Sequence, residues 1–320
     1  MSPHAPARVL DWVMDKSLVL GYTRLGPRIR RSWWPADPRP ASLAGRHVLV
    51  TGASGGLGLA AAQQLAALGA TVHLLGRTAD RLESARSELL AAEPTARVEL
   101  APCDLSDLDV VREFCVDFAG RVPALHGLVH NAGVLPPERR TTAQGHELTL
   151  ATHVLGPHLM TGLLAESLRG GRVVVVSSGG AYGQKLAVDD LEYTRGDYSG
   201  VTAYARTKRM QLVLTEQWAD RLRGRQVGVH SMHPGWADTP GVTESLPGFN
   251  KLMRPLLRSA AEGADTVSWL LATDDPIGTG GFWHDRRRRP THYAPFGVET
   301  ALQRQRFWEL VTAATGETFA

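Results

Sequence analysis

Cysteine is nearly absent from this 320-residue chain, which contains only Cys103 and Cys115. They lie twelve positions apart, and neither belongs to a Cys-x-x-Cys pair or to a Cys/His set with metal-ligand spacing. A disulfide-stabilised scaffold and a cysteine-ligated metal site are therefore excluded, and we predict no bound metal. Such sparse cysteine fits a reducing compartment, so we expect a cytoplasmic protein.

Long apolar runs are also absent. No stretch reaches the roughly 18 apolar residues that a transmembrane helix needs. Asp11, Asp15 and Lys16 interrupt the apolar residues near the N-terminus, which therefore lacks the pattern of a signal peptide.

Lysine is the third scarce residue, with four copies against thirty-one arginines. The formal net charge is only +3, and the arginines are scattered along the chain. This distribution does not predict a nucleic-acid-binding surface. The one dense basic run, HDRRRRP at 284–290, is interpreted as a solvated loop.

Apolar runs that alternate with helical stretches dominate residues 46–285. Hydrophobic residues make up 43% of the chain, enough for a large buried core. Strands followed by helices of this length predict an α/β fold, a single-domain Rossmann-type doubly wound parallel sheet of about seven strands. The expected strands are 47–51, 71–75, 97–100, 127–130, 172–177, 226–232 and 280–284, and the expected helices are 57–69, 78–92, 143–169, 201–223 and 260–273.

A helical extension precedes this domain. Residues 5–22 form an amphipathic helical pattern, and arginines and the pair Trp33–Trp34 follow. Either the segment 5–34 makes peripheral contact with a membrane surface, or it packs on its own domain, which we favour. A Pro-rich linker ends the extension. The chain is thus divided into the extension and linker (1–45), the Rossmann domain (46–285) and a tail with a helix (286–320).

A glycine-rich loop, VTGASGGLG at 50–58, joins the first strand to the first helix. Glycine permits a tight turn and close approach of the backbone, and the helix N-terminus offers free N–H groups to a pyrophosphate. A tight turn without a ligand is the alternative, but the strand before it and the Ala-rich helix after it favour a dinucleotide site. The candidate contacts are Gly52, Ser54, Gly56, Leu57 and Gly58.

The second strand ends in LLGRT, at the position where an acidic residue would hold a ribose 2′-OH and favour NAD. Gly76 instead leaves space, and Arg77 supplies a planar cation that suits a 2′-phosphate. We therefore predict NADP(H) in preference to NAD(H). The alternative is that Arg77 is one of many surface arginines.

Tyr204 and Lys208, in TAYARTK at 202–208, lie one helical turn apart and share a helix face. A carbonyl that receives a hydride also needs a proton, and a free tyrosine with a pKa of about 10 exchanges protons poorly at neutral pH. A neighbouring ammonium favours the phenolate and lowers that pKa. Ser178, at the end of the fifth strand, can donate a hydrogen bond to the same oxygen, with Ser177 as the competing candidate.

Six motifs, in this order, resemble the short-chain dehydrogenase/reductase superfamily. They are TGASGGLG, CDL at 103–105, NAG at 131–133 with His130 in place of a first Asn, SS at 177–178, YARTK, and HPGWADT at 233–239. SSGGAYGQKL and SMHPGWADTPGV are most similar to the branch called dehydrogenase/reductase SDR family member 12, near the retinol dehydrogenase-like members. The resemblance implies that Tyr204 is the general acid/base and that Lys208 holds the nicotinamide ribose. It adds cofactor contacts at Asp104, Leu105, Asn131, Ala132, Gly133, Pro234, Gly235 and Thr239.

Two departures from the family pattern are present. Ser178 and Tyr204 lie 26 positions apart, more than is usual in the family, and we expect the extra segment 184–200 to form a loop at the rim of the site. His153 stands where the family usually has an Asn that helps to position a relay water near the lysine. A neutral histidine can hydrogen-bond water and shuttle protons, so we expect His153 to replace that Asn in the relay, with a merely tolerated replacement as the alternative.

Residues 240–260 mix Pro and Gly with large apolar side chains and resemble the mobile substrate lid of the superfamily. The prediction is an NADP-dependent oxidoreductase that interconverts a hydrophobic carbonyl compound, such as a lipid, isoprenoid or steroid, and its alcohol. A catalytically silent NADP-binding scaffold or sensor is the alternative. A nucleotide-sugar epimerase fits neither the glycine spacing nor the length of the C-terminal part. The resemblance also makes a homodimer one candidate assembly.

Overall fold

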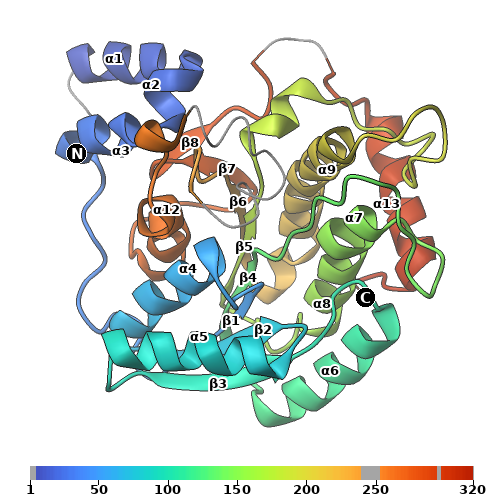
Figure 1. The fold of residues 1–320 in the computed structure, drawn as a ribbon, viewed down its shortest axis with the longest axis horizontal. Helices are drawn as coiled ribbons and strands as arrows, with labels where there is room; N and C mark the ends of the chain where they lie inside the picture. Colours follow the sequence, from blue (N-terminus) through green and yellow to red (C-terminus); the bar gives the residue numbers. More distant parts are fainter. Residues whose placement is uncertain (1–4, 239–252, 294–296, 320) are drawn as a thin grey trace.

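An eight-stranded sheet covered by helices on both faces forms the centre of the molecule (Figure 1). The computed structural model describes residues 5–238, 253–293 and 297–319. The strand order is β3-β2-β1-β4-β5-β6-β7-β8, with only the last pair antiparallel, which confirms the predicted doubly wound parallel sheet. The strands are β1 (His47–Thr51), β2 (Thr71–Gly76), β3 (Arg97–Pro102), β4 (Leu125–His130), β5 (Arg172–Val176), β6 (Gly228–Met232), β7 (Gly281–His284) and β8 (Arg287–Arg289).

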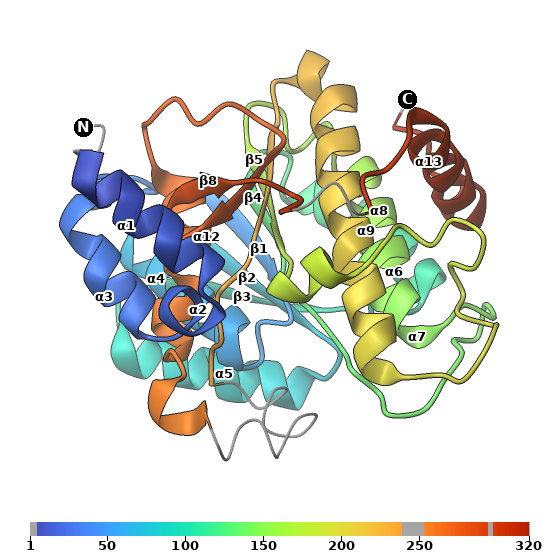
Figure 2. The ribbon, with the colours of Figure 1, turned by 90° about the horizontal axis from the view of Figure 1, so that it is seen from above.

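The helices form two layers, one on each face of the sheet, which Figure 2 shows from above. One layer contains α4 (Gly56–Ala67), α5 (Ala79–Ala92) and α12 (Ala260–Ala272). The other contains α6 (Leu108–Arg121), α8 (Gly156–Leu163) and α9 (Gly200–Arg221), with α13 (Ala301–Thr315) packed against α8. Each layer buries its own apolar core, so the central strands are dry on both faces.

The helix α6, between the third and fourth strands, is absent from the sequence-based prediction. Leu108, Val111 and Cys115 face the core at helical spacing, and the Asp107 carboxylate caps the N-terminus by accepting from the backbone N–H groups of residues 109 and 110. This spacing is present in the sequence, but charged residues interrupt it and hide the apolar stripe.

The single helix expected over 143–169 is broken in the structure. It consists of α7 (Leu148–Leu150), a π-helical turn over Ala151–Leu155, and α8, which ends at Leu163. Pro157 gives a physical reason for the break, because proline has no N–H to donate to the carbonyl of His153 four residues earlier.

The basic run 284–290 is not the solvated loop that the sequence predicts, because it forms a hairpin turn and strand β8. Asp285 and Arg286 form the turn with left-handed φ angles of 51° and 53°, which are unfavourable for residues other than glycine. Buried ion pairs hold them there. Asp285 binds Arg30 and Arg258 at 2.6 Å each, and Arg286 binds Asp265 at 2.6 Å. The prediction failed because these partners are distant in sequence.

The carboxylate of Asp285 carries a full charge inside the protein. The side chains of Asp285, Arg30 and Arg258 are at most 2% exposed. Burial by itself would raise the pKa of Asp285, but the Arg258 and Arg30 guanidiniums and His284 hold it well below its usual range. The two arginines and the carboxylate therefore stabilise one another only as a set.

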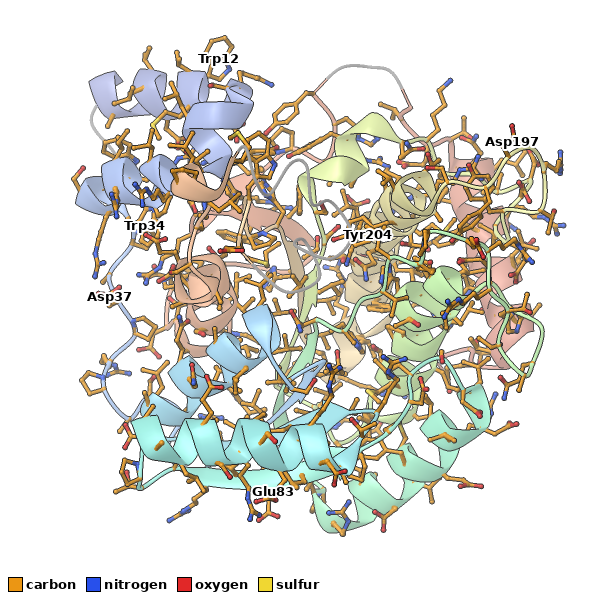
Figure 3. The ribbon with its side chains drawn as sticks, viewed as in Figure 1. Trp12, Trp34, Asp37, Glu83, Asp197 and Tyr204 are labelled. Atoms are coloured by element: carbon orange, nitrogen blue, oxygen red, sulfur yellow. The ribbon has the colours of Figure 1, made fainter. Side chains whose placement is uncertain are left out.

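The N-terminal extension, comprising α1 (Ala5–Lys16), α2 (Leu18–Tyr22) and α3 (Leu25–Arg30), packs on its own domain. Asp11 is buried and binds Arg30 at 2.8 Å and Arg289 at 2.7 Å, which joins the extension to the hairpin by charge. The opposite side exposes Trp12, which is 63% accessible and points away from the domain (Figure 3). Within the described ranges, no helix is long and apolar enough to cross a membrane.

We predict that Asp285→Asn destabilises the protein by about 3–5 kcal/mol, because it leaves two buried guanidiniums without a counter-charge. Urea unfolding measures the change. Asp274→Asn is the control, since Asp274 pairs with Arg39 on the surface and its loss should cost less than about 0.5 kcal/mol. Equal free energies of unfolding for both variants would contradict the anchoring role of Asp285.

Candidate active site

The site lies at the edge of the sheet where parallel strands β1, β4, β5 and β6 end. The strand order reverses between β1 and β4, which are direct neighbours. In open parallel sheets, ligands bind at such a switch point. The loops after these four strands carry the glycine loop, Asn131–Gly133, Ser178 and Pro234–Gly235, and helix α9 brings Tyr204 and Lys208 to the same edge.

The glycine loop after β1 is built for close backbone contact. Gly52 has a φ of 65°, and a Cβ there would lie 2.7 Å from the Cα of Ala132. A Cβ on Gly58 would lie 2.5 Å from the Asn131 amide nitrogen, whereas Gly55 faces open space. No side chain caps the N-terminus of α4, unlike α6, α9, α12 and α13. The uncapped N–H groups and the glycine cradle fit a pyrophosphate.

Thr51, which the sequence prediction missed, ties this loop to the one after β4. Its hydroxyl oxygen accepts the backbone N–H groups of Asn131 at 2.9 Å and Ala132 at 3.0 Å. The Asn131 amide donates to the Thr51 carbonyl at 3.0 Å. The two loops therefore form one rigid unit, with Gly133 exposed beside it. A strand-end threonine has no distinctive sequence signal, so only the structure reveals this connection.

The candidate adenosine side of the site lies at the ends of β2 and β3. Gly76 is buried and Arg77 is exposed, with no ion pair to it among the described residues. Asp104 is half-buried, and its Oδ1 accepts from the backbone N–H and the hydroxyl of Ser106 at 2.9 and 2.7 Å. Leu105 is buried, whereas Ser54 is exposed in the glycine loop. Arg77 thus stands available to an anionic group.

Ser178, Tyr204 and Lys208 meet at the chemical end of the site. A hydrogen bond links Ser178 to Tyr204. Burial raises the pKa of the Tyr204 phenol and the bond to Ser178 lowers it, and the net pKa lies above the usual value. Lys208 lies with its Nζ 5.2 Å from the Tyr204 ring centroid and donates to the Val176 carbonyl at 2.8 Å. Desolvation lowers the pKa of Lys208 to about 7.

The neighbouring Ser177 has a different partner. It is buried, and its hydroxyl donates to the Lys208 carbonyl at 3.0 Å. This bond fixes β5 to the helix that carries Tyr204. Ser178 is therefore the one of the two serines whose hydroxyl lies beside the tyrosine.

His153 is fully buried next to Tyr204, at 5.5 Å between ring centroids. The backbone N–H of Val134 donates to its Nε2 at 2.9 Å, so the ring proton sits on Nδ1. Nδ1 then donates to the Thr207 hydroxyl at 2.7 Å, which donates to the Tyr204 carbonyl at 2.8 Å. Burial, with help from Lys208, keeps the pKa of His153 well below its usual value. Both ring nitrogens are engaged, which argues against the predicted relay through this side chain.

Gln211, also missed from sequence, completes the helix break around His153. Its amide donates to the His153 carbonyl at 3.0 Å and so replaces the N–H that Pro157 lacks.

Some of the remaining predicted cofactor contacts lie at the same edge of the sheet, and others lie outside the described residues. Pro234 and Gly235 follow β6, with Gly235 at a φ of 76°, and Leu57 packs close to Gly263 on α12. Thr239 and residues 240–252 of the expected lid lie outside the described residues, whereas Arg258 near its end is the buried anchor described above.

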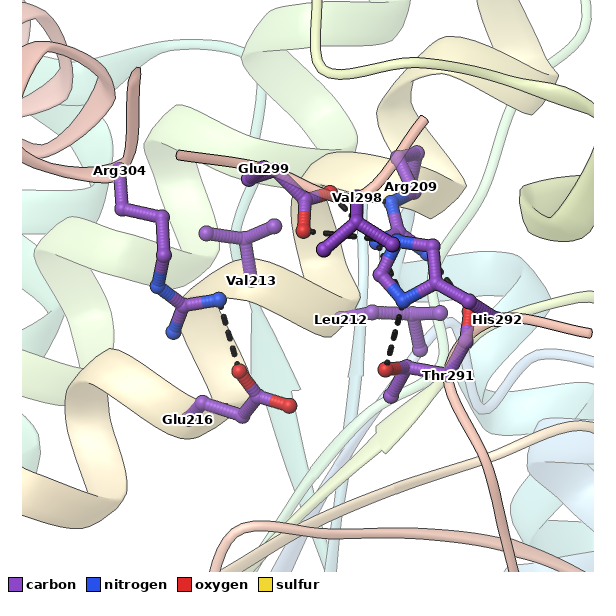
Figure 4. A pocket seen from close by; sticks show the side chains of 9 residues that line it. All are labelled: Arg209, Leu212, Val213, Glu216, Thr291, His292, Val298, Glu299 and Arg304. Atoms are coloured by element: carbon purple, nitrogen blue, oxygen red, sulfur yellow. Dashed lines mark hydrogen bonds and ion pairs between the residues drawn. The ribbon is translucent and has the colours of Figure 1, made fainter. Parts of the chain in front are cut away.

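A separate cavity of about 220 Å³ lies between α9 and the C-terminal segment (Figure 4). Arg209 crosses it to bind Glu299 at 2.5 Å, and Arg304 binds Glu216 at 2.8 Å. Neither Ser178 nor Tyr204 lines it. Its charges are already paired, so it is a structural junction that fixes the C-terminal segment to α9.

The Rossmann-type sheet, the uncapped glycine loop and the Ser–Tyr–Lys edge define an NAD(P)-dependent oxidoreductase that acts on CH–OH and C=O groups. Residues 46–248 match the family model described as short chain dehydrogenase. The chain belongs to the short-chain dehydrogenase/reductase family.

Similar proteins support the predicted branch. Dehydrogenase/reductase SDR family member 12 of Bos taurus is 39% identical over 280 residues, covering 85% of this chain and 86% of that protein. Human retinol dehydrogenase 12 is 35% identical over 229 residues, covering 70% of this chain and 72% of that protein. A crystal structure of a short chain dehydrogenase from Burkholderia cenocepacia, in complex with NADP, superposes with a TM-score of 0.62 at 26% identity, covering 75% of this chain and 96% of that one.

The lowered pKa of Lys208 predicts a pH dependence of catalysis. The ammonium form of Lys208 predominates below about pH 7 and is lost above it. Only this charged form stabilises the phenolate that remains once Tyr204 has given its proton to the substrate. We expect kcat/KM for carbonyl reduction to be flat below pH 7 and to fall above it. Lys208→Arg keeps its charge and should give a lower but flat profile through pH 7–9. An unchanged inflection in that variant would assign the titration to another group.

Proposed function

We propose that the protein is an NADP-dependent oxidoreductase that interconverts a hydrophobic carbonyl compound and its alcohol, with Tyr204 as the general acid/base. The observation that carries the proposal is the meeting of Ser178, Tyr204 and the buried Lys208 at the same sheet edge as the uncapped glycine loop. The alternative, a silent NADP-binding scaffold, has no need of a buried ammonium beside a tyrosine, because burying that charge is costly in desolvation.

Each side chain has a distinct role in the proposed reaction. When bound, a nicotinamide dinucleotide supplies or accepts the hydride. Ser178 hydrogen-bonds the substrate oxygen and orients it toward Tyr204. In reduction the Tyr204 hydroxyl gives its proton to that oxygen, and in oxidation the phenolate takes it back. Lys208 stabilises the phenolate and contacts the ribose.

We propose a positioning role for His153 in place of the relay. The ring links the loop after β4, through Val134, to the backbone of Tyr204, through Thr207. It therefore holds the cofactor-side loop and the catalytic helix at a fixed separation.

The hydrophobic substrate class rests on the apolar lid sequence and on the relatives. The name of human retinol dehydrogenase 12 identifies an apolar isoprenoid alcohol as the substrate of that protein. We infer a substrate of similar polarity for this chain.

Replacing Tyr204 by Phe should reduce kcat by about 10²–10⁴-fold, because the proton donor is lost while the ring remains. The assay is substrate-dependent NADPH oxidation over a panel of hydrophobic aldehydes and ketones. Tyr198→Phe, which removes a hydroxyl bonded to Glu147 outside the site, is the control and should keep its activity. Wild-type protein that binds NADPH but reduces nothing on the panel would favour the scaffold alternative.

The NADP preference is assigned to Arg77. Arg77→Ala should weaken NADPH binding by about 10- to 100-fold, the value of a charge-assisted contact to a phosphate, and leave NADH binding nearly unchanged. Fluorescence titration gives both dissociation constants. Arg81→Ala, an exposed arginine one turn further along, is the matched control. An unchanged NADPH constant for Arg77→Ala would overturn the assignment.

We also infer a cytoplasmic protein that touches a membrane surface through residues 5–34. The exposed side of the extension combines large apolar side chains with Lys16, Arg28 and Arg31, a pattern suited to an anionic interface. The apolar residues are Val9, Leu10, Trp12, Val13, Leu20 and Ile29. The homodimer stays a prediction of the resemblance.

Trp12→Ser should reduce co-sedimentation with phosphatidylserine-rich vesicles at least twofold, because Trp12 is the largest of these exposed side chains. Val116→Ser, which removes an exposed apolar side chain from α6, should have no effect. Failure of the unmodified protein to co-sediment would exclude the interfacial role.

A further inference from the structure

Tyr22, the last residue of α2, places its ring against the loop that carries Ser178. The side chain is only 3% exposed. A Cβ built on Gly179 would lie 2.6 Å from Cε2 of Tyr22, so the ring is in direct contact with the residue that follows Ser178. Gly179 does not have a left-handed φ. The Tyr22 ring is thus the obstacle to a side chain at position 179.

The same residue also contacts the turn after β6, where Pro234 and Gly235 lie. The Tyr22 carbonyl accepts the backbone N–H of Trp236 at 2.7 Å, and a Cβ on Gly235 would lie 2.6 Å from that carbonyl oxygen. The Tyr22 ring lies 4.6 Å from the His233 ring and 5.9 Å from the Trp236 ring, centroid to centroid. Tyr22 therefore fills the space between two loops that belong to different strands.

Buried charges prevent this residue from moving aside. Arg258 donates to the carbonyls of Tyr22 at 3.0 Å and Gly21 at 2.7 Å, and the His284 Nε2 lies 3.0 Å from the same Gly21 oxygen. Arg258 is itself held by Asp285. Burial, with Asp15, raises the pKa of Tyr22 to about 12, so its phenol is neutral at physiological pH. Tyr22 thus places an uncharged ring between the two loops, on a backbone that Arg258 and His284 hold in place.

We propose that Tyr22 is a positioning residue of the active site, which sets the separation between the Ser178 loop and the Pro234–Gly235 turn. The catalytic site is then composite, because a segment that precedes the Rossmann domain completes it. This role rests on the proposed function, in which Ser178 orients the substrate oxygen and the Pro234–Gly235 turn lies beside the nicotinamide. Small displacements between these two groups are costly to the reaction rate.

The test is a double-mutant cycle between Gly179 and Tyr22 in the full chain. Gly179→Ala adds a methyl that pushes the Tyr22 ring toward the Pro234–Gly235 turn. We expect this variant to lower kcat at least tenfold. We also expect it to weaken NADPH binding about fivefold, although position 179 lies on the Ser178 loop and not on the Pro234–Gly235 turn beside the nicotinamide. In a Tyr22→Ala background the methyl has room, so Gly179→Ala should cause no further change. In a Tyr22→Phe background, which keeps the ring, its effect should persist.

Two controls separate positioning from general loss of structure. Gly183→Ala adds a methyl to the same loop in open space and should leave NADPH binding unchanged. Met14→Ala destabilises the extension by removing a fully buried side chain other than Tyr22, so at equal loss of melting temperature its kcat should exceed that of Tyr22→Ala.

Equal effects of Gly179→Ala in the wild-type and Tyr22→Ala backgrounds would overturn the proposal, as would equal kcat values for Met14→Ala and Tyr22→Ala. Measuring the cycle in NADPH affinity as well as in kcat makes the test of Tyr22 independent of turnover. If the protein reduces no carbonyl compound but the cycle in NADPH affinity is non-additive, the proposed function fails and the coupling through Tyr22 stands.

Discussion

An ionised carboxylate inside a protein persists only where cations and hydrogen-bond donors surround it, and Asp285 is held by this requirement. Its two ion-pair partners join the β7–β8 turn to two distant parts of the chain: Arg30 comes from the extension and Arg258 from the segment before α12. The left-handed turn, the docking of the extension and the placement of Tyr22 all depend on this one arrangement. Buried charge thereby fixes the extension whose Tyr22 ring packs beside the sheet edge that carries the candidate chemistry.

The cofactor side of the site uses a different device, in which small residues and backbone groups replace charges. Gly52 and Gly58 allow the loops after β1 and β4 to touch, and the Thr51 hydroxyl joins them. His153 continues this connection to helix α9 through Thr207. Candidate residues on three separate elements are therefore held by neutral hydrogen bonds, and the buried Lys208 places its Nζ 5.2 Å from the Tyr204 ring centroid.

Local patterns in the sequence were enough to predict the parallel sheet, the glycine loop and the Tyr204–Lys208 pair, because each depends on residues close together in the chain. The features that the sequence did not predict depend instead on residues far apart in the chain. The arginines of 284–290 appear solvated until Asp11 and Asp265 are brought beside them by the fold. Thr51, Gln211 and Tyr22 have ordinary local sequences, and their contacts lie with residues 80, 58 and more than 150 positions away. The hydrogen-bond partners of His153 could not be known from sequence, so sequence alone could not distinguish a relay from a positioning role.

The ion pair between Arg30 and Asp285 spans 255 positions of the chain. On the ribosome, the extension is made first, and its counter-charge emerges only after most of the Rossmann domain has been synthesised. Until then the α1–α3 segment has no docking surface, and the Ser178 loop lacks its neighbouring ring. Contacts of such high sequence separation form late and slow the final stage of folding. The order of synthesis thus keeps the sheet edge of the candidate site incomplete until the β7–β8 turn has been made.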